Sequence, residues 1–250
     1  MQEEAKELIG FLSNTSEVIK DFTKFLIDIF KPAVTEFVDY LITDRLKFRR
    51  AKNLITFKTK VLEKAEKLRL SPDDYKELPI KIGIPILENA SLEEDNSLQE
   101  LWANLMTKAL DPNFKEEIRT AYIDIIKGLS PLDVKILNYC YEFTMTPYSN
   151  VVFNTFAPKG ITFYRVLEDL KLQEDDLLIS IYNLFRLRVL SPLIKELGFD
   201  YYERHVGSGI MSKEEYYSII FPRGNKADQG HYEFAVTMFG KFFIEACIKE

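Results

Sequence analysis

The longest stretch of the chain without glycine or proline restricts the folds that it can adopt. It lies between Pro32 and Pro72, and a helical pattern runs through it from Ala33 to Leu68. Its apolar residues recur at spacings that keep them near one stripe of an α-helix. They are Val34, Val38, Leu41, Leu46, Leu54, Phe57, Val61, Ala65 and Leu68. A helix of about 35 residues would be about 50 Å long. Such a length is typical of a coiled-coil-like hairpin or of a strut between two subunits.

Other patterns within the first 128 residues also indicate helices. Residues 78–87 contain two prolines and predict either a short kinked helix or an irregular buried segment. The run 91–94 (Ser-Leu-Glu-Glu) has the pattern of a capping box, which predicts a helix start. Residues 98–109 form a strongly amphipathic pattern that includes Trp102 and that Asp111-Pro112 ends. A further pattern begins at Phe114 and stops at Gly128.

The pattern changes after Gly128. The expected elements are helices at 131–143, 162–170 and 174–188, a strand that starts in 189–192, a strand at 231–237 and a helix at 238–249. Three helices, a strand pair and a last helix follow the order of a winged helix. We therefore expect a mainly α fold with two domains. Residues 1–128 would form a helical bundle with long helices, and residues 129–250 a winged-helix-like domain with a small β-wing.

Charge is distributed unevenly along the chain. The formal net charge is −6, yet residues 45–69 carry ten basic and two acidic side chains, whereas residues 71–126 carry twelve acidic and five basic ones. Pairing of the two regions within the chain is the simpler interpretation. The alternative is that the basic segment binds nucleic acid or another anion. The candidate residues for that contact are Arg45, Arg49, Arg50 and Lys52.

The composition argues against several classes of site. The two cysteines, Cys140 and Cys247, are too few for a disulfide framework and favour a reducing compartment. The two histidines, His205 and His231, exclude most zinc sites. No phosphate-binding loop or hydrolase motif occurs. We therefore predict no catalytic residue, no metal, no cofactor and no small-molecule ligand. Enzymatic activity is not expected, although the sequence leaves it open.

Acidic residues also cluster around the predicted helix start near residue 91. They are Glu88, Glu93, Glu94, Asp95 and Glu100. They could hold a cation, but a favourable interaction with the helix N-terminus explains them more simply. The helix expected at 174–188 opens with Glu174-Asp175-Asp176, and these carboxylates would repel a DNA phosphate. We therefore do not favour DNA reading by this helix.

The N-terminus has the wrong charge for a signal peptide, and no apolar run reaches the length of a membrane span. A cytoplasmic location is the expectation. Residues 3–30 nevertheless predict one wide apolar helical face.

Four blocks of sequence resemble one protein family. They are residues 78–94 (LPIKIGIPILENASLEE), residues 98–112, with Trp102-Ala103-Asn104, residues 128–137 (GLSPLDVKIL) and residues 232–244 (YEFAVTMFGKFFI). Together they resemble the Abi-alpha family, the abortive-infection alpha proteins of bacteria. The resemblance implies defence against bacteriophage, in which an infected cell halts growth or dies before the phage matures. It implies no catalytic residues.

These observations lead to one main hypothesis and two alternatives. The main hypothesis is a non-enzymatic anti-phage protein that acts by binding a protein partner or by self-association. One alternative is an effector that perturbs membranes through the helix at 3–30. The other is nucleic-acid binding through the basic segment 45–69.

Overall fold

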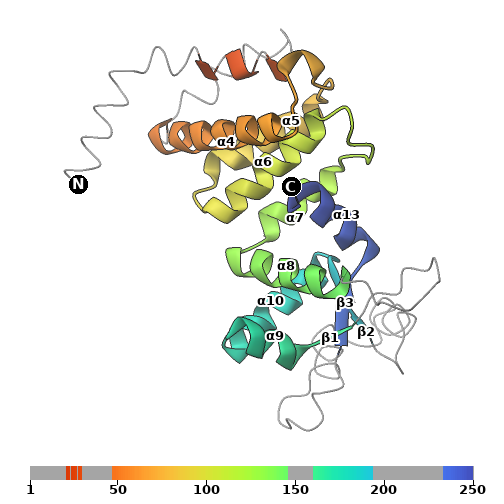
Figure 1. Cartoon of the computed structure of the whole chain (residues 1–250). Helices are drawn as coiled ribbons and strands as arrows, with labels where there is room; N and C mark the ends of the chain where they lie inside the picture. The colour runs from red at the N-terminus through yellow and green to blue at the C-terminus, as the bar shows by residue number, and fades with distance from the viewer. Residues whose placement is uncertain are drawn as a thin grey trace. The chain divides into compact units, whose positions relative to one another are not determined.

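The computed structural model describes residues 21–22, 24–26, 28–29, 47–145, 160–193 and 233–249. These residues are mainly helical and include one small antiparallel sheet (Figure 1). This confirms the expectation of a mainly α fold with little β-structure. The chain divides into two compact units, one made of residues 1–127 and 245–250 and the other of residues 128–244.

The first unit is built on α4 (Lys47–Lys67), which packs against α5 (Ile80–Leu92) and α6 (Asn96–Leu110). A short 3₁₀ helix (Pro72–Asp74) follows α4. α7 (Thr120–Gly128) belongs to this unit except for its last residue, Gly128, with which the second unit begins. Large side chains from three helices fill its core, among them Phe57, Ile86 and Trp102, each with at most 1% of its surface exposed. The predicted core position of Trp102 is thereby confirmed.

Three expectations for this unit need comment. The capping box predicted at Ser91 is wrong, because α5 continues to Leu92 and buries Ser91 in its last turn. Asp95 caps α6 instead and accepts from the backbone N–H of Ser97 at 2.8 Å and of Leu98 at 3.1 Å. The helix predicted from Phe114 begins only at Thr120. The start of the long helix expected at 33–68 lies outside the described residues. The part of this range that the structure describes is helical from Lys47 to Lys67.

The second unit contains a three-stranded sheet and the helices around it. The chain order is α8 (Pro131–Met145), β1 (Ile161–Thr162), α9 (Phe163–Leu170), α10 (Glu174–Arg186), β2 (Leu190–Leu193), β3 (Glu233–Val236) and α13 (Met238–Cys247). β3 is the central strand and pairs antiparallel with both others. In its register, Phe234 lies opposite Ile161 on β1 and opposite Pro192 on β2. The two strands predicted near 190 and 234 are therefore present.

Thr237, which lies between β3 and α13, is held in place by hydrogen bonds of its backbone and its hydroxyl. Its N–H donates to the carbonyl of Val189 at 3.1 Å, and its hydroxyl donates to the carbonyl of Arg188 at 2.7 Å. The same hydroxyl accepts from the N–H of Gly240 at 2.8 Å, which caps the first turn of α13. The start of α13 is thereby held against the backbone that leads into β2.

At the other end of the unit, Ser130 and Asp133 form a reciprocal cap on α8. The Ser130 N–H donates to the Asp133 carboxylate at 2.7 Å, and the Asp133 N–H donates to the Ser130 hydroxyl at 3.2 Å. The amide of Asn183 on α10 donates to the same carboxylate at 2.9 Å and to the carbonyl of Gly128 at 2.7 Å. This network attaches α10 to the start of α8.

Candidate functional site

The candidate anion-binding residues lie in the first turns of α4, as far as the structure describes them. Arg45 lies outside the described residues. Arg49 and Lys52 are exposed one turn apart, and Arg50 between them is half-buried. The guanidinium of Arg49 lies 3.5 Å from the carboxylate of Glu94. The structure therefore brings three of the four candidates to one end of one helix.

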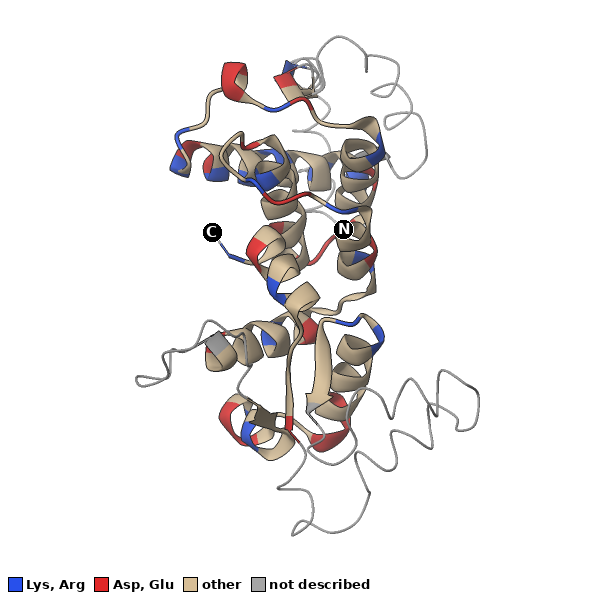
Figure 2. Ribbon diagram, turned by 90° about the vertical axis from the view of Figure 1, so that its right-hand side faces the viewer, with Lys and Arg blue, Asp and Glu red and all other residues tan. Residues whose placement is uncertain are grey.

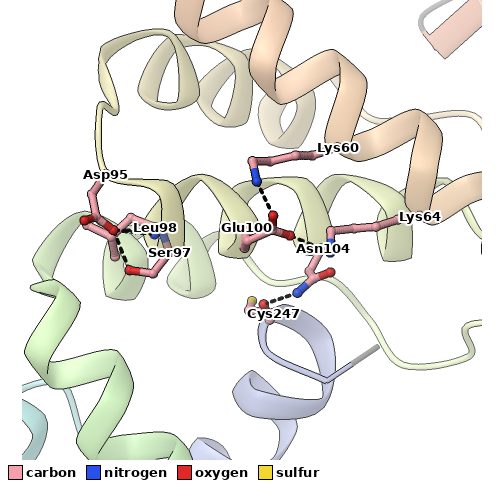
Figure 3. Close-up of polar contacts among 8 residues, drawn as sticks. All are labelled: Lys60, Lys64, Asp95, Ser97, Leu98, Glu100, Asn104 and Cys247. Carbon is pink, nitrogen blue, oxygen red and sulfur yellow. Dashed lines mark hydrogen bonds and ion pairs between the residues drawn. The ribbon is translucent and has the colours of Figure 1, made fainter.

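Further along α4, three lysines are largely buried and paired with acids, and Figure 3 shows two of them, Lys60 and Lys64. The ammonium groups of Lys60 and Lys64 both bind the carboxylate of Glu100 on α6, Lys64 at 2.7 Å. Only 12% of the Lys60 side chain and 9% of the Lys64 side chain are exposed. Lys58 likewise pairs with Asp21. These three lysines hold helices together, which leaves the beginning of α4 as its most accessible basic part.

The two lysines also change the acidity of Glu100. Burial by itself raises the pKa of this carboxyl, but the hydrogen bonds and positive charges of Lys60 and Lys64 outweigh it, and the pKa lies below its ordinary value. The pKa of Asp95 is lowered as well, chiefly by the hydrogen bond from the Ser97 hydroxyl. Both carboxyls are therefore more acidic in the folded first unit than in the unfolded chain.

These shifts predict that acid destabilises the first unit. A carboxyl whose pKa is lower in the folded state stabilises that state above the unfolded pKa of about 4.3, and the contribution is lost as the pH falls through the folded pKa. Urea unfolding followed by Trp102 fluorescence between pH 6 and pH 2.5 should show this decline. Glu100→Gln should flatten the curve below about pH 4.5. An unchanged pH profile in that variant would show that Glu100 titrates normally.

The largest exposed apolar side chains form a second kind of feature. Ile179 on α10 is 68% exposed, and the two ends of α5 carry Ile80, which is 56% exposed, and Leu92, which is 55% exposed. Leu92 follows Ser91, whose carbonyl accepts from the amide of Asn53 on α4 at 3.1 Å. Leu92 therefore lies beside the basic first turns of α4. Burying such side chains is favourable by roughly 1.5–3 kcal/mol each, so these positions suit contact with another molecule.

Ile179 belongs to an acidic helix face. Glu174, Asp175 and Asp176 form the first turn of α10, and all three are exposed. Asp175 and Asp176 precede Ile179 by four and three residues, so they flank it on the helix surface. Figure 2 shows where acidic and basic residues lie along the helices. The three acids predicted at this helix start are thus present, together with an apolar side chain that their pattern did not predict.

The described residues offer little that resembles a catalytic or metal centre. Burial raises the pKa of both cysteine thiols, Cys140 and Cys247, which keeps them protonated and unreactive. Within the described ranges, no group of three potential ligands could hold a metal ion. Of the acids near residue 91, Glu94 and Glu100 instead pair with basic side chains of α4, and Asp95 caps α6. His205 and His231 lie outside the described residues.

Asn104, in the Trp-Ala-Asn block, has a structural role. Its amide donates to the carbonyl of Cys247 at 2.9 Å, and both residues are buried (Figure 3). Cys247 is the last residue of α13 and belongs to the first unit. The bond satisfies a carbonyl that the end of α13 would otherwise leave without a helical partner. Asn104 thereby attaches the last turn of α13 to α6.

No helix among the described residues has the combination of length and apolar character needed to cross a membrane.

Comparison with known proteins gives one match. A protein-family model described as "Abortive infection alpha" matches residues 49–247, which is most of the chain. The match includes the four blocks that carry the resemblance to this family. Neither the curated proteins nor the solved structures contain a match.

Proposed function

The chain belongs to the abortive infection alpha family, and from that premise we propose that it acts in this defence without catalysis, by protein–protein interaction or assembly. Family membership itself implies a protein of abortive infection, which protects bacteria against bacteriophage. The molecular activity is our proposal. Its main support is the outer face of α10, where three exposed carboxylates stand beside an isoleucine that is 68% exposed.

The second unit supports the proposal of a winged-helix-like domain that binds a protein and does not read DNA. Its order of one helix, one strand, two helices and two strands fits a winged helix, and α10 would be the recognition helix. A recognition helix that reads DNA presents groups that bind phosphates and bases, whereas α10 begins with three acids. We accordingly propose domains at 1–128 and 129–250, the second a winged-helix-like interaction module, and a cytoplasmic location.

The two alternatives have weaker support. Nucleic-acid binding through 45–69 would depend on the first turns of α4, because Lys58, Lys60 and Lys64 already pair with carboxylates. Membrane insertion of 3–30 would need its apolar face to leave the protein, yet Phe22, Phe25 and Leu26 are buried. Protein contact through α10 requires neither the paired lysines of α4 nor the exposure of buried side chains in 3–30.

A phage infection assay tests the proposal. Cells that express the chain should form fewer plaques than cells without it, and the double variant Asp175→Lys/Asp176→Lys should raise the plaque count to that of unprotected cells. The physical reason is that the reversed charges repel a partner that the acids attract.

The matched control is Glu116→Lys/Glu117→Lys, which makes the same charge change at two exposed acids between α6 and α7. It should keep full protection. Circular dichroism must show that both variants fold. Full protection by the α10 variant would refute a role for this face, and loss of protection in both variants would indicate a nonspecific effect of charge.

A further inference from the structure

We propose that the acidic start of α10 in one copy of the chain docks on the basic start of α4 in a second copy. This inference rests on the proposed function, because it names the partner of the same α10 face. We call Glu174, Asp175, Asp176 and Ile179 the acidic surface, and Arg49, Arg50, Lys52 and Leu92 the basic surface. The contact joins two different surfaces, so it is head-to-tail.

The acidic surface is suited to a basic partner with an apolar side chain. Residues 163–178, which include α9 and the start of α10, carry five acidic and two basic side chains. The three acids of the first turn are exposed around Ile179. This combination would repel a nucleic acid or an anionic membrane, whereas a cationic protein surface could satisfy the charges and cover the isoleucine.

The basic surface has the complementary arrangement. Residues 45–52 carry five basic side chains and no acid. Leu92 provides an exposed apolar side chain beside them, since the bond from Asn53 to the Ser91 carbonyl holds the end of α5 against α4. Each surface therefore consists of one exposed aliphatic side chain bordered by charges, and the charges of the two surfaces are opposite.

The exposed Leu92 favours a second copy over a nucleic acid on the basic surface. Glu94 already lies 3.5 Å from the Arg49 guanidinium, and this exposed pair is weak enough to exchange for a partner carboxylate. A phosphate backbone would not bury Leu92. The acidic surface offers both carboxylates and an aliphatic side chain.

Head-to-tail contacts leave one free surface of each kind at the ends of every open assembly. They therefore produce a closed ring or an open chain rather than a fixed dimer. The inference thus predicts that the average mass in solution rises with protein concentration. Because opposite charges draw the copies together, association should weaken as salt screens them.

Sedimentation velocity on the full chain tests the contact with reciprocal charge reversals. The first variant is Asp175→Lys/Asp176→Lys, and the second is Arg49→Glu/Lys52→Glu. Each alone should weaken self-association by about tenfold or more, because the changed surface then repels its partner surface. A variant that carries all four substitutions should associate again, since both surfaces have exchanged their charge. Ile179→Ala should weaken association while leaving every charge in place.

The control Glu116→Lys/Glu117→Lys should associate like the unmodified chain. The inference is overturned if the unmodified chain stays monomeric at all concentrations, if neither reversal changes its association, or if the fourfold variant fails to recover while it remains folded. It is also overturned if a fluorescent single-stranded oligonucleotide binds the unmodified chain but not the Arg49→Glu/Lys52→Glu variant, and this binding does not reduce self-association. A monomeric chain that still protects cells from phage would refute this contact and leave the proposed function standing.

Discussion

Replacing Gly240 with alanine is expected to destabilise the second unit by about 3 kcal/mol, at the upper end of the usual cost of overpacking. A Cβ atom at this position would lie 2.9 Å from the carbonyl carbon of Val189 and 3.0 Å from its Cα, and closer still to the carbonyl oxygen. These atoms belong to the backbone and cannot rotate away. The same carbonyl accepts from the Thr237 N–H, so moving it would also disturb the start of α13.

Gly128→Ala is the matched control within the same unit. Its Cβ would meet a methyl carbon of Leu187 at 3.0 Å and a guanidinium nitrogen of Arg186 at 3.1 Å. Both atoms are the ends of flexible side chains, so the cost should be less than about 1 kcal/mol. Urea unfolding followed by circular dichroism compares the two variants. Equal stability of the Gly240 variant and the unmodified chain would show that the backbone near Val189 moves freely.

The tryptophan makes it possible to separate the two units in such experiments. The chain has one tryptophan, Trp102, and it lies in the core of the first unit. Its fluorescence follows unfolding of that unit, whereas circular dichroism follows the helices of both. In the Gly240 variant, part of the circular dichroism transition should move to lower urea concentration than the fluorescence transition.

The apolar spacing in the sequence predicted most of the described helices, but it did not predict all of their first and last residues. The predicted cap, Ser91, and the observed cap, Asp95, lie four residues apart, and both residue types are common at helix starts. The choice between them depends on tertiary contacts: Ser91 is buried, and its carbonyl accepts from Asn53, 38 residues earlier in the chain. The late start of α7 has a similar cause, because the Phe114 carbonyl accepts from the Lys76 ammonium and not from a helical N–H.

The candidate surfaces were predictable in part. Opposite net charges at 45–69 and 71–126 indicated pairing, and Lys60, Lys64 and Glu100 provide an example. The sequence could not show which lysines pair, because this depends on the rotation of α4 against α6. The sequence also did not predict that Leu92 and Ile179 are exposed, since an aliphatic residue in an amphipathic helix is normally expected on the buried side.

The pairing at Glu100 leads to the second large effect. Glu100→Leu is expected to lower the free energy of unfolding of the first unit by about 2–3 kcal/mol. Removing the carboxylate leaves the largely buried ammonium groups of Lys60 and Lys64 close together without the acid that both bind. Removing one partner of a fully buried pair costs about 3–5 kcal/mol. The cost here is lower because 37% of the Glu100 side chain is exposed and water screens part of the charge.

A triple variant distinguishes charge from packing. In Lys60→Met/Lys64→Met/Glu100→Leu, all three charges are replaced by apolar groups of similar length, which often costs little or even stabilises a protein. We expect its stability to return to within about 1 kcal/mol of the unmodified chain. Urea unfolding followed by Trp102 fluorescence measures both variants. If Glu100→Leu costs less than about 0.5 kcal/mol, the pairing is no stronger than an exposed ion pair. If the triple variant stays as unstable as the single one, the loss comes from packing at position 100 and not from the stranded ammonium groups.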